Sequence, residues 1–224
     1  MRLGAIVLCG GKSTRMGADK ASLPFGDETM LGRVVRLLST VAGPIVVVTA
    51  AGQARQTLPV PCRFATDERP DRGPLEGLAA GLRAIGNDAD AVYATSCDVP
   101  LLVPAVVTAL VERLGDHDDS QFEIVVPWDG KYHHPLSAVY RIGVLPKIDE
   151  LLAADRLRPT DLFNLVPTNR VSTAELRAVD PELETLRNLN RPEDYLAALA
   201  AAGFAPPPDI LTNLRRESRT EPNG

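Results

Sequence analysis

The sequence predicts an α/β protein, a three-layer αβα sandwich built around a mixed but mostly parallel sheet. Along most of the 224 residues, short β-branched runs alternate with segments whose apolar residues have helical spacing. Strands separated by helices form right-handed crossovers to parallel neighbours. One late pair of strand-like runs is joined by a short turn, which predicts an antiparallel strand within the same sheet.

Each expected element follows from a local pattern. The strand-like runs are apolar, and most end in turn-forming residues: 5–9, 44–49, 63–66, 90–97, 122–127 and, after a turn at 128–131, 132–140. The helical segments carry an apolar stripe: 30–40, a helix that begins at Pro74, 104–114, 144–154 and 192–202. Three of these helices are expected to begin at a proline, which suits the first helical position because its missing N–H would have no partner there.

Length and composition indicate one globular domain over residues 1–204. Hydrophobic residues make up 45% of the chain and charged residues 24%, which is ordinary for a folded protein. The composition changes from Ala205 onward, where three consecutive prolines precede a polar stretch with little to bury. We therefore expect a disordered tail at residues 205–224.

Charge and cysteine usage exclude several classes of protein. The net charge of −5 does not favour nucleic acid or an anionic membrane as the main partner. Cys9, Cys62 and Cys97 form no C-x-x-C pair, and their odd number predicts free thiols in a reducing compartment. No apolar run has the length of a transmembrane helix, and the first one is too short for a signal peptide. We expect a cytoplasmic protein.

A glycine-rich loop, LCGGKSTRMGADK at residues 8–20, follows the first strand. Open α/β sheets bind their ligands at this end of a strand. Gly10 and Gly11 allow positive φ and let backbone N–H groups approach phosphate oxygens, while Arg15 and Lys20 add positive charge. The loop lacks the first glycine of a Walker A motif and the dinucleotide G-x-G-x-x-G pattern. It therefore predicts a different kind of phosphate site, with a solvated glycine turn as the alternative.

This loop resembles the signature L-x-G-G-x-S-x-R-M-G-x-D-K of nucleotidyltransferases that activate small molecules. It is most similar to that of the molybdenum cofactor guanylyltransferases, which join GMP from GTP to molybdopterin, whereas related cytidylyltransferases usually have Ala-Ala-Gly at residues 9–11. The resemblance implies a Rossmann-like fold of the nucleotide-diphospho-sugar transferase type. It also implies nucleotide-binding and catalytic roles in the loop: Leu8, Cys9, Gly10, Gly11 and Lys20 bind the nucleotide, and Lys20 and Arg15 are catalytic.

Asp98 is the candidate metal ligand. It directly follows the strand-like run 90–97, and Pro100 prevents that strand from continuing. Nucleotidyl transfer requires neutralisation of charge on phosphates, which Mg²⁺ provides when one or two carboxylates and the substrate hold it. The family's D-x-P motif matches here, so the resemblance makes Asp98 the Mg²⁺ ligand, a catalytic residue and a nucleotide contact. A turn or helix-cap role is the alternative.

The resemblance extends to two other strand ends. Asp67 follows the run 63–66, where the family has an acidic residue that contacts the nucleotide, although a solvated turn residue would give the same pattern. The segment GPLEGL at 73–78 resembles the family's helix start, and helix N-termini favour anions.

Thr49 replaces an asparagine that often touches guanine in the guanylyltransferases. Because threonine can still donate and accept a hydrogen bond, we expect Thr49 to contact the base.

Two later segments match the acceptor side of the family, and a third supplies arginines. His134 and the proline after it match an H-P or Q-P pair close to the acceptor pocket. The segment NLNRPED at 188–194 resembles the family's N-x-N-x-P-E-D/E segment, so Asn188 and Asn190 could meet the pterin or the water shell of the metal. Arg156 and Arg158, which precede Pro159, could meet the acceptor phosphate. Strand pairing for the histidine and helix capping for the asparagines are the alternatives.

These assignments predict transfer of GMP from GTP to molybdenum-molybdopterin, with Mg²⁺ as cofactor and pyrophosphate as product. The acceptor phosphate is already ionised at neutral pH, so catalysis would rest on positioning and electrostatics. Two kinds of function remain as alternatives. One is a related nucleotidyltransferase that uses CTP with molybdopterin, or a nucleoside triphosphate with a sugar phosphate. The other is a nucleotide-binding module without catalysis. Molybdoenzyme-specific chaperones are further candidate partners.

Overall fold

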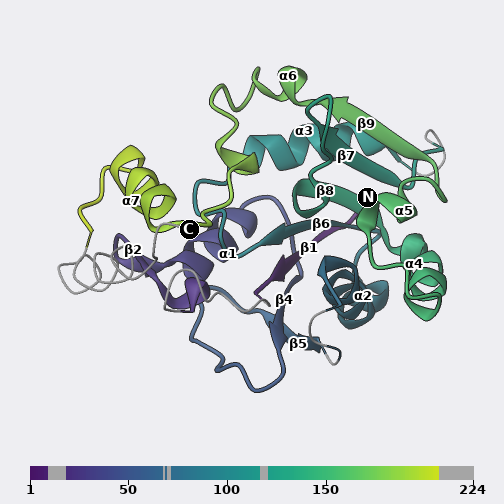
Figure 1. Cartoon of the computed structure of the whole chain (residues 1–224), viewed down its shortest axis with the longest axis horizontal. Coiled ribbons are helices and arrows are strands. Elements are labelled where there is room, and N and C mark those ends of the chain that lie inside the picture. The colour runs from purple at the N-terminus through teal and green to yellow at the C-terminus, as the bar shows by residue number, and fades with distance from the viewer. Residues whose placement is uncertain (10–18, 68, 70–71, 117–120, 207–224) are drawn as a thin grey trace, which may run out of the picture.

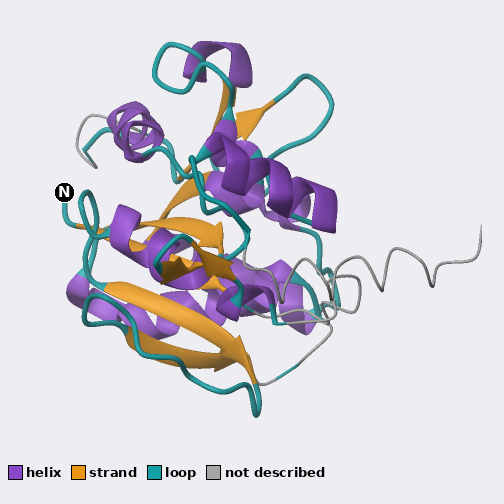
Figure 2. Ribbon diagram, turned by 90° about the vertical axis from the view of Figure 1, so that its left-hand side faces the viewer, coloured by secondary structure: helices purple, strands orange, loops and turns teal. Residues whose placement is uncertain are grey.

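The computed structural model describes residues 1–9, 19–67, 69, 72–116 and 121–206. In this part of the chain a seven-stranded sheet has the order β5-β4-β1-β6-β8-β7-β9, with helices on both faces (Figures 1 and 2). Strand β8 is antiparallel to both of its neighbours, and the other pairings are parallel. The predicted α/β sandwich and its single antiparallel strand are confirmed.

Most strands form where apolar runs predicted them. Their bounds are β1 (Leu3–Leu8), β4 (Ile45–Ala50), β5 (Arg63–Asp67), β6 (Ala91–Ser96), β7 (Ile124–Trp128), β8 (Ala138–Arg141) and β9 (Thr168–Ser172). A separate hairpin contains β2 (Pro24–Phe25) and β3 (Glu28–Thr29). The sequence did not predict β9, because this edge strand is mostly polar and has no apolar run.

The predicted returning strand at 132–140 is wrong over its first half. His133 forms only an isolated bridge with Trp128, which itself belongs to β7 rather than to the expected turn. Residues Pro135–Ser137 form a short 3-10 helix, η4, and β8 begins only at Ala138. The proline that opens η4 explains the difference, because it has no N–H to donate to a strand ladder.

The predicted helices are present, and the three that were expected to begin at a proline do so. Their bounds are α1 (Met30–Leu38), α2 (Pro74–Ile85), α3 (Pro104–Leu114), α4 (Leu145–Ala153) and α7 (Pro192–Ala201). Two four-residue helices, α5 (Pro159–Leu162) and α6 (Thr173–Leu176), were not predicted, because they are too short to show a helical period. Further 3-10 turns are η2 (Lys20–Ser22), η3 (Gly86–Asp88), η5 (Ile142–Val144) and η6 (Glu184–Leu186).

Two apolar cores cover the two faces of the sheet. Helices α1 and α3 pack on the face that carries Val7 and Tyr93, while α2 and α4 pack on the face that carries Ile6 and Val92. Successive residues of a strand point to opposite faces. Because β1, β4 and β6 are buried on both faces, their sequences are continuous apolar runs.

A third, smaller core joins two regions that are far apart in the sequence. Tyr195 and Leu199 of α7 pack with Phe25 of β2 and with Met30, the first residue of α1. Figure 1 shows α7 lying beside β2. The segment that leads into α7 is therefore brought close to the segment that follows Lys20.

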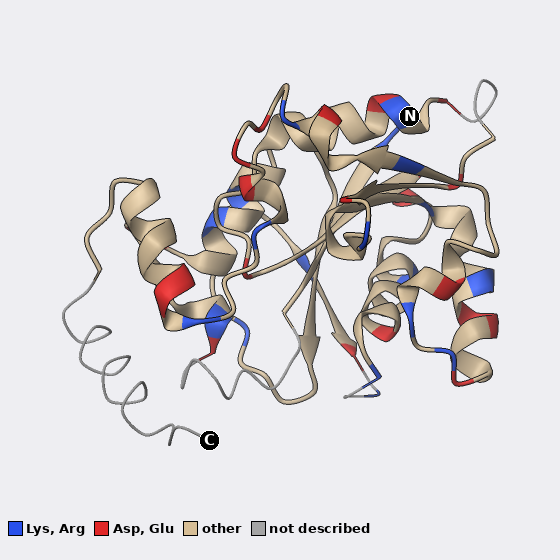
Figure 3. Ribbon diagram, turned by 45° about the horizontal axis from the view of Figure 1, so that its top comes forward, with Lys and Arg blue, Asp and Glu red and all other residues tan. Residues whose placement is uncertain are grey.

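The surface carries charges of both signs. Basic and acidic residues are interspersed along the ribbon (Figure 3). Among the described helices, none is both long and apolar enough to cross a membrane. Residues 207–224, which make up most of the predicted tail, lie outside the described residues.

A glycine in α2 is required by its contact with β1. A Cβ built on Gly81 would come within 2.6 Å of Cγ2 of Ile6, whose side chain is fully buried. Alanine improves helix propensity by about 1 kcal/mol, but overpacking a core costs about 1–3 kcal/mol. We expect Gly81→Ala to lower the free energy of unfolding by about 1–2 kcal/mol in urea titrations. In an Ile6→Ala background, Gly81→Ala should no longer lower the free energy of unfolding. An equal decrease in both backgrounds would show that the contact with Ile6 is not the cause.

Candidate active site

The carboxyl ends of β1, β4, β5 and β6 meet at one edge of the sheet, because these neighbours are parallel. From β1 the chain first adds β4 and β5 on one side, and it then returns to add β6 on the other. Such a reversal opens a ligand-binding crevice beyond the strand ends. Cys9, Thr49, Asp67 and Asp98 lie at or just beyond these ends, as the sequence predicted.

Three side chains from distant segments meet at this edge. The Lys20 Nζ atom lies 3.1 Å from Oδ2 of Asp98 and donates a hydrogen bond of 3.0 Å to Oδ1 of Asn190. The side chains of Lys20 and Asp98 are only 15% and 13% exposed. Water screens this pair less than a surface pair, so its field acts more strongly on a bound ligand. We call these three residues the Lys20–Asp98–Asn190 cluster.

Asp98 is held by groups outside its own turn. The hydroxyl of Ser96, the last residue of β6, donates to Oδ1 of Asp98. The Leu189 N–H donates to the Asp98 carbonyl oxygen over 2.9 Å. The sequence analysis missed Ser96, although a hydroxyl two residues before a carboxylate at a strand end was an available signal. Donors therefore reach both the side chain and the backbone of Asp98 and hold its orientation.

Lys20 is positioned by the residue before it. Asp19 caps η2, because its Oδ1 accepts the Ala21 N–H over 3.1 Å. The Gln53 side chain donates to both carboxylate oxygens of Asp19 over 3.3 Å. The two residues of the Asp-Lys motif thus have different tasks: the aspartate fixes the turn, and the lysine reaches the cluster.

Cys9 and Cys97 continue the strand pairing beyond the ends of β1 and β6. The Cys97 N–H donates to the Leu8 carbonyl over 3.1 Å, and the Cys9 N–H donates to Val48 over 2.8 Å. Both thiols are buried and free, as predicted. The hydrogen bond with Cys97 and the burial raise the pKa of the Cys9 thiol. Its side chain is therefore a neutral packing group at the base of the glycine loop.

Thr49 lies near the end of β4, which continues to Ala50. Its side chain is buried, and its hydroxyl lies 3.5 Å from the carbonyl oxygen of Ala65 in β5. This distance is at the limit of a hydrogen bond, so the Thr49 hydroxyl bonds to the Ala65 carbonyl weakly at most.

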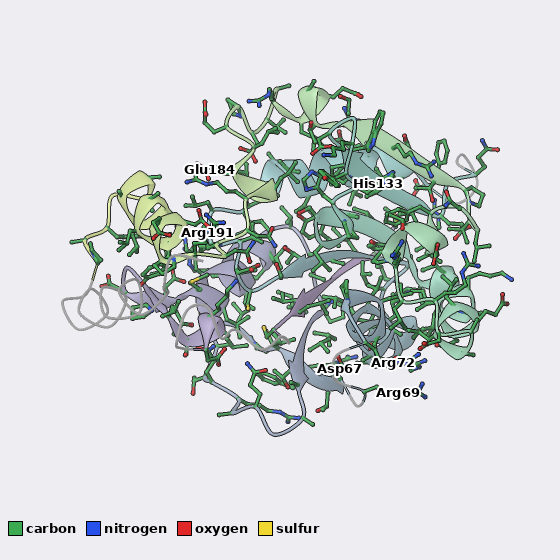
Figure 4. All side chains as sticks on the ribbon, viewed as in Figure 1. Asp67, Arg69, Arg72, His133, Glu184 and Arg191 are labelled. Carbon is green, nitrogen blue, oxygen red and sulfur yellow. The ribbon has the colours of Figure 1, made fainter. Side chains whose placement is uncertain are left out.

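Asp67 ends β5 at the same edge of the sheet. Its Oδ1 accepts the backbone N–H of Arg69 over 3.0 Å. Figure 4 shows Asp67, Arg69 and Arg72 near one another at the side of α2. The Arg72 Nε atom lies 3.3 Å from the buried carboxylate of Glu76, and Nη2 donates to the Leu152 carbonyl over 2.6 Å. Arg72 therefore ties the region after Asp67 to the end of α4.

Arg158 lies beside the start of α2. The neighbouring Leu157 carbonyl oxygen is 3.9 Å from the point that a Cβ would take on Gly73, which caps this helix. Arg156 pairs with Asp161 over 3.2 Å, whereas Arg158 is exposed and forms no ion pair within the described residues. Of the two arginines in this loop, Arg158 is thus the one available to a ligand.

His134 lies beyond the end of β7, between the strands of the interrupted hairpin. Its backbone N–H donates to the Pro127 carbonyl over 2.9 Å, and the Nε2 atom of its ring lies 3.9 Å from Oδ2 of Asp129. Burial lowers the pKa of His134, while the Asp129 carboxylate acts in the opposite direction. His133 is engaged elsewhere: its ring packs on Phe163, with 5.3 Å between the centroids.

Thr185 connects the segments of the predicted acceptor side. It is fully buried, its hydroxyl oxygen accepts the Val103 N–H over 3.0 Å, and its carbonyl accepts the Ser137 hydroxyl over 3.3 Å. This anchors the segment that leads to Asn188 and Asn190 against the loops after β6 and before β8. Both asparagines are exposed, but of the two only Asn190 contacts Lys20.

Some predicted residues cannot be placed. Gly10, Gly11 and Arg15 lie outside the described residues. In the described part of the chain, no group of three or more His, Cys, Asp or Glu residues could hold a metal by itself. The structure therefore supplies one cluster and several nearby strand ends.

Comparison with known proteins shows which sequences this chain is similar to. Residues 5–164 match the family model described as the MobA-like NTP transferase domain. A protein of Mycobacterium avium (strain 104), named "Probable molybdenum cofactor guanylyltransferase", is 39% identical over 207 residues, which cover 90% of this chain and 97% of the relative. A protein of the same name from Mycobacterium tuberculosis H37Rv is 35% identical over 178 residues, which cover 78% and 86%.

Solved structures share the fold at lower sequence identity. Molybdopterin-guanine dinucleotide biosynthesis protein A from Archaeoglobus fulgidus matches with a TM-score of 0.69 at 20% identity, over 91% of this chain and 99% of that one. The 2-C-methyl-D-erythritol 4-phosphate cytidylyltransferase of Thermus thermophilus matches with a TM-score of 0.64 at 14% identity, over 89% and 98%. These matches confirm the nucleotide-diphospho-sugar transferase type of α/β fold.

The environment of His134 predicts how it titrates. Burial favours the neutral imidazole, so its pKa in the folded state lies below the ordinary 6.5. Asp129→Asn removes the one charge that opposes this shift, and we expect the pKa of His134 to fall further. Titration of the imidazole by NMR measures it. A pKa that stays unchanged or rises in the variant would contradict the pairing with Asp129.

The lowered pKa of His134 also determines how its contribution to stability depends on pH. A folded-state pKa below the unfolded value means that the unfolded chain binds the proton more readily. The contribution of His134 to stability is therefore complete above the unfolded pKa and is lost as the pH falls through it towards the folded pKa.

Proposed function

Because the chain belongs to the family of MobA-like NTP transferases, we propose that it transfers GMP from GTP to a phosphate of molybdenum-molybdopterin and releases pyrophosphate. The names of the relatives support the choice of GTP and of molybdopterin. The observation that carries the chemistry is the Lys20–Asp98–Asn190 cluster at the carboxyl edge of the sheet.

Lys20 is suited to bind a phosphate while it remains in the cluster. Its ammonium group has three donors, of which Asp98 and Asn190 take two. The third can donate to a phosphate oxygen on the nucleotide. Because the side chain is 15% exposed, its charge acts with little screening on the negative charge that develops during transfer. Gly10, Gly11 and Arg15, which lie outside the described residues, are proposed to add backbone and guanidinium donors.

The oxygen atoms of Asp98 and Asn190 fit a magnesium ion. Carboxylate and amide oxygens are hard ligands, and both oxygens that accept from Lys20 have further lone pairs. One carboxylate with substrate phosphates is a common way to hold Mg²⁺, which agrees with the absence of a larger acidic or histidine cluster among the described residues. When bound, Mg²⁺ would neutralise charge on the α-phosphate and on the leaving pyrophosphate.

The reaction needs no strong general base from the protein. An oxygen of the acceptor phosphate attacks the α-phosphorus and a new P–O bond forms. The bond from the α-phosphorus to the α–β bridging oxygen breaks, and that oxygen leaves as a terminal oxygen of pyrophosphate. The attacking oxygen is already ionised at neutral pH. His134, Arg158, Asn188 and Asn190 are then proposed to orient the acceptor, and Thr49 and Asp67 to contact the nucleotide. The role of the chain is to position and to stabilise charge.

Two alternatives lead to different measurements. A related nucleotidyltransferase would use CTP with molybdopterin, or a nucleoside triphosphate with a sugar phosphate. A binding module would bind a triphosphate and release no pyrophosphate. Pyrophosphate release should be measured with Mg²⁺ and each of GTP, CTP, ATP and UTP, with and without molybdenum-loaded molybdopterin. Release that requires both GTP and the pterin is expected. Release with CTP instead, or none with any nucleotide, would reject the proposal.

The cluster residues are expected to matter for rate rather than for folding. Lys20→Ala and Asp98→Asn should each lower kcat by roughly 10²–10³-fold, because each removes a charge that acts in the transition state. Lys147→Ala is the matched control, since Lys147 is a partly exposed lysine that pairs with Glu150 on α4. Circular dichroism should show folded protein in every case. Near wild-type rates in either cluster variant would disprove the assignment.

Thr49 is proposed to contribute to base selection. If its hydroxyl bonds to guanine, Thr49→Val should lower kcat/KM for GTP relative to CTP by roughly tenfold or more, because a buried polar group of the base loses its partner. Steady-state kinetics with both nucleotides measure this ratio. An unchanged ratio would remove Thr49 from the base site and leave the rest of the proposal intact.

A further inference from the structure

Arg33 of α1 is a largely buried arginine without a role in the chemistry described above. Its side chain is 19% exposed, and its Nε donates a hydrogen bond of 2.8 Å to the carbonyl oxygen of Pro100. Its guanidinium carbon lies 5.1 Å from the ring centroid of Phe25 and 5.5 Å from that of Phe204. A guanidinium at this distance from an aromatic ring is attracted to its face, more strongly where water is excluded.

Pro100 belongs to the turn that carries Asp98. The turn is buried, and Leu102 closes it by donating to the Val99 carbonyl over 3.1 Å. Asp98 and Pro100 each give their carbonyl oxygen to a donor from another segment: Leu189 bonds to the first and Arg33 to the second. Both ends of the turn are therefore fixed from outside, and Arg33 is the side chain that fixes one of them.

Phe204 follows α7 and lies against the β2–β3 hairpin. Its ring is nearly perpendicular to that of Phe25, with 5.7 Å between the centroids. A Cβ on Gly26, which turns the hairpin with φ +67°, would come within 2.7 Å of the Phe204 ring. The Tyr195 hydroxyl of α7 also donates to the Pro24 carbonyl. The hairpin and α7 are thus in direct contact.

These contacts join the three segments that supply the Lys20–Asp98–Asn190 cluster. The hairpin directly follows Lys20, the Pro100 turn carries Asp98, and α7 directly follows Asn190. We propose that Arg33 is a positioning residue that sets the spacing within this cluster without touching any of its side chains. The inference rests on the proposed function, because the spacing matters for the metal and the triphosphate. A mutation remote from the reacting atoms that misplaces them by about 1 Å can lower the rate roughly 10²-fold.

Arg36 offers a matched control. It lies one turn further along α1 and donates to both carboxylate oxygens of Glu28 over 2.8 Å. Arg33 also faces Glu28, over 3.8 Å. Within the described residues, however, Arg36 contacts neither Pro100 nor the two rings. Arg36→Met therefore removes a charge and an ion pair of the same helix while it leaves the proposed link intact.

The test compares Arg33→Met, Arg33→Lys, Phe204→Leu and Arg36→Met with the wild-type chain. Binding of Mn²⁺ in the presence of a non-hydrolysable GTP analogue is followed by electron paramagnetic resonance. Steady-state pyrophosphate release gives kcat and KM for GTP, and thermal unfolding reports stability. Arg33→Met should weaken Mn²⁺ binding and lower kcat by roughly 10–100-fold, with little change in KM, because the nucleotide's base contacts remain.

The other variants make the result specific. Arg33→Lys keeps the charge near the rings but not the fixed fork of donors, so it should restore only part of the loss. Phe204→Leu should show a smaller defect of the same kind, and Arg36→Met should behave as wild type. A variant of Arg33 that loses thermal stability alone, with normal Mn²⁺ binding and kcat, would overturn the inference. An equal defect in Arg36→Met would overturn it as well.

Two further outcomes are separable. If Arg33→Met does not fold, Arg33→Lys and Phe204→Leu decide, because they keep more of the packing. If the wild-type chain releases no pyrophosphate with any nucleotide, the proposed function fails. In that event the Mn²⁺ measurement with the analogue still decides for or against Arg33.

Discussion

The contact between the Asp98 carboxylate and the Lys20 ammonium depends on the strand order of the sheet. A carboxylate this poorly exposed would be costly without a partner, and here it has both an ammonium group and the Ser96 hydroxyl. The aspartate is at the end of β6 and the lysine lies beyond the loop after β1. The two can meet only because β1 and β6 are adjacent and parallel. The strand order of the sheet therefore creates the pair.

The same pair is well placed for nucleotidyl transfer. Charges that are partly shielded from water interact strongly with each other and with a ligand, and they need little rearrangement when charge develops on it. At β1 the order in which the chain adds its strands reverses, and a ligand bound beyond the strand ends there would lie next to this pair. Asp67 and Thr49 approach this edge from β5 and β4, on the side of β1 opposite to Asp98. A nucleotide that reached both sides would cross the end of β1.

The third core links the site to the C-terminal part of the described chain. Asn190 reaches Lys20 because α7 is docked on the hairpin that follows that lysine. The hydrogen bonds of Thr185 to Val103 and Ser137 hold the preceding segment against the rest of the domain. The proposed acceptor side is thus assembled from segments that are far apart in the sequence. The buried Thr185 and, in α7, Tyr195 anchor these segments to the rest of the domain.

The sequence by itself determined the central strands, the helices that begin at prolines and the position of Asp98 after β6. These features depend on local patterns: buried parallel strands need continuous apolar runs, and proline suits the first helical turn. The sequence could not determine β9, a polar edge strand without an apolar run. It also did not indicate that the Arg33 guanidinium lies beside the rings of Phe25 and Phe204. Lys20 and Asn190 are 170 residues apart, and no local pattern encodes their contact. Only the tertiary structure decided these features, because they arise from which surfaces pack together once the sheet has formed.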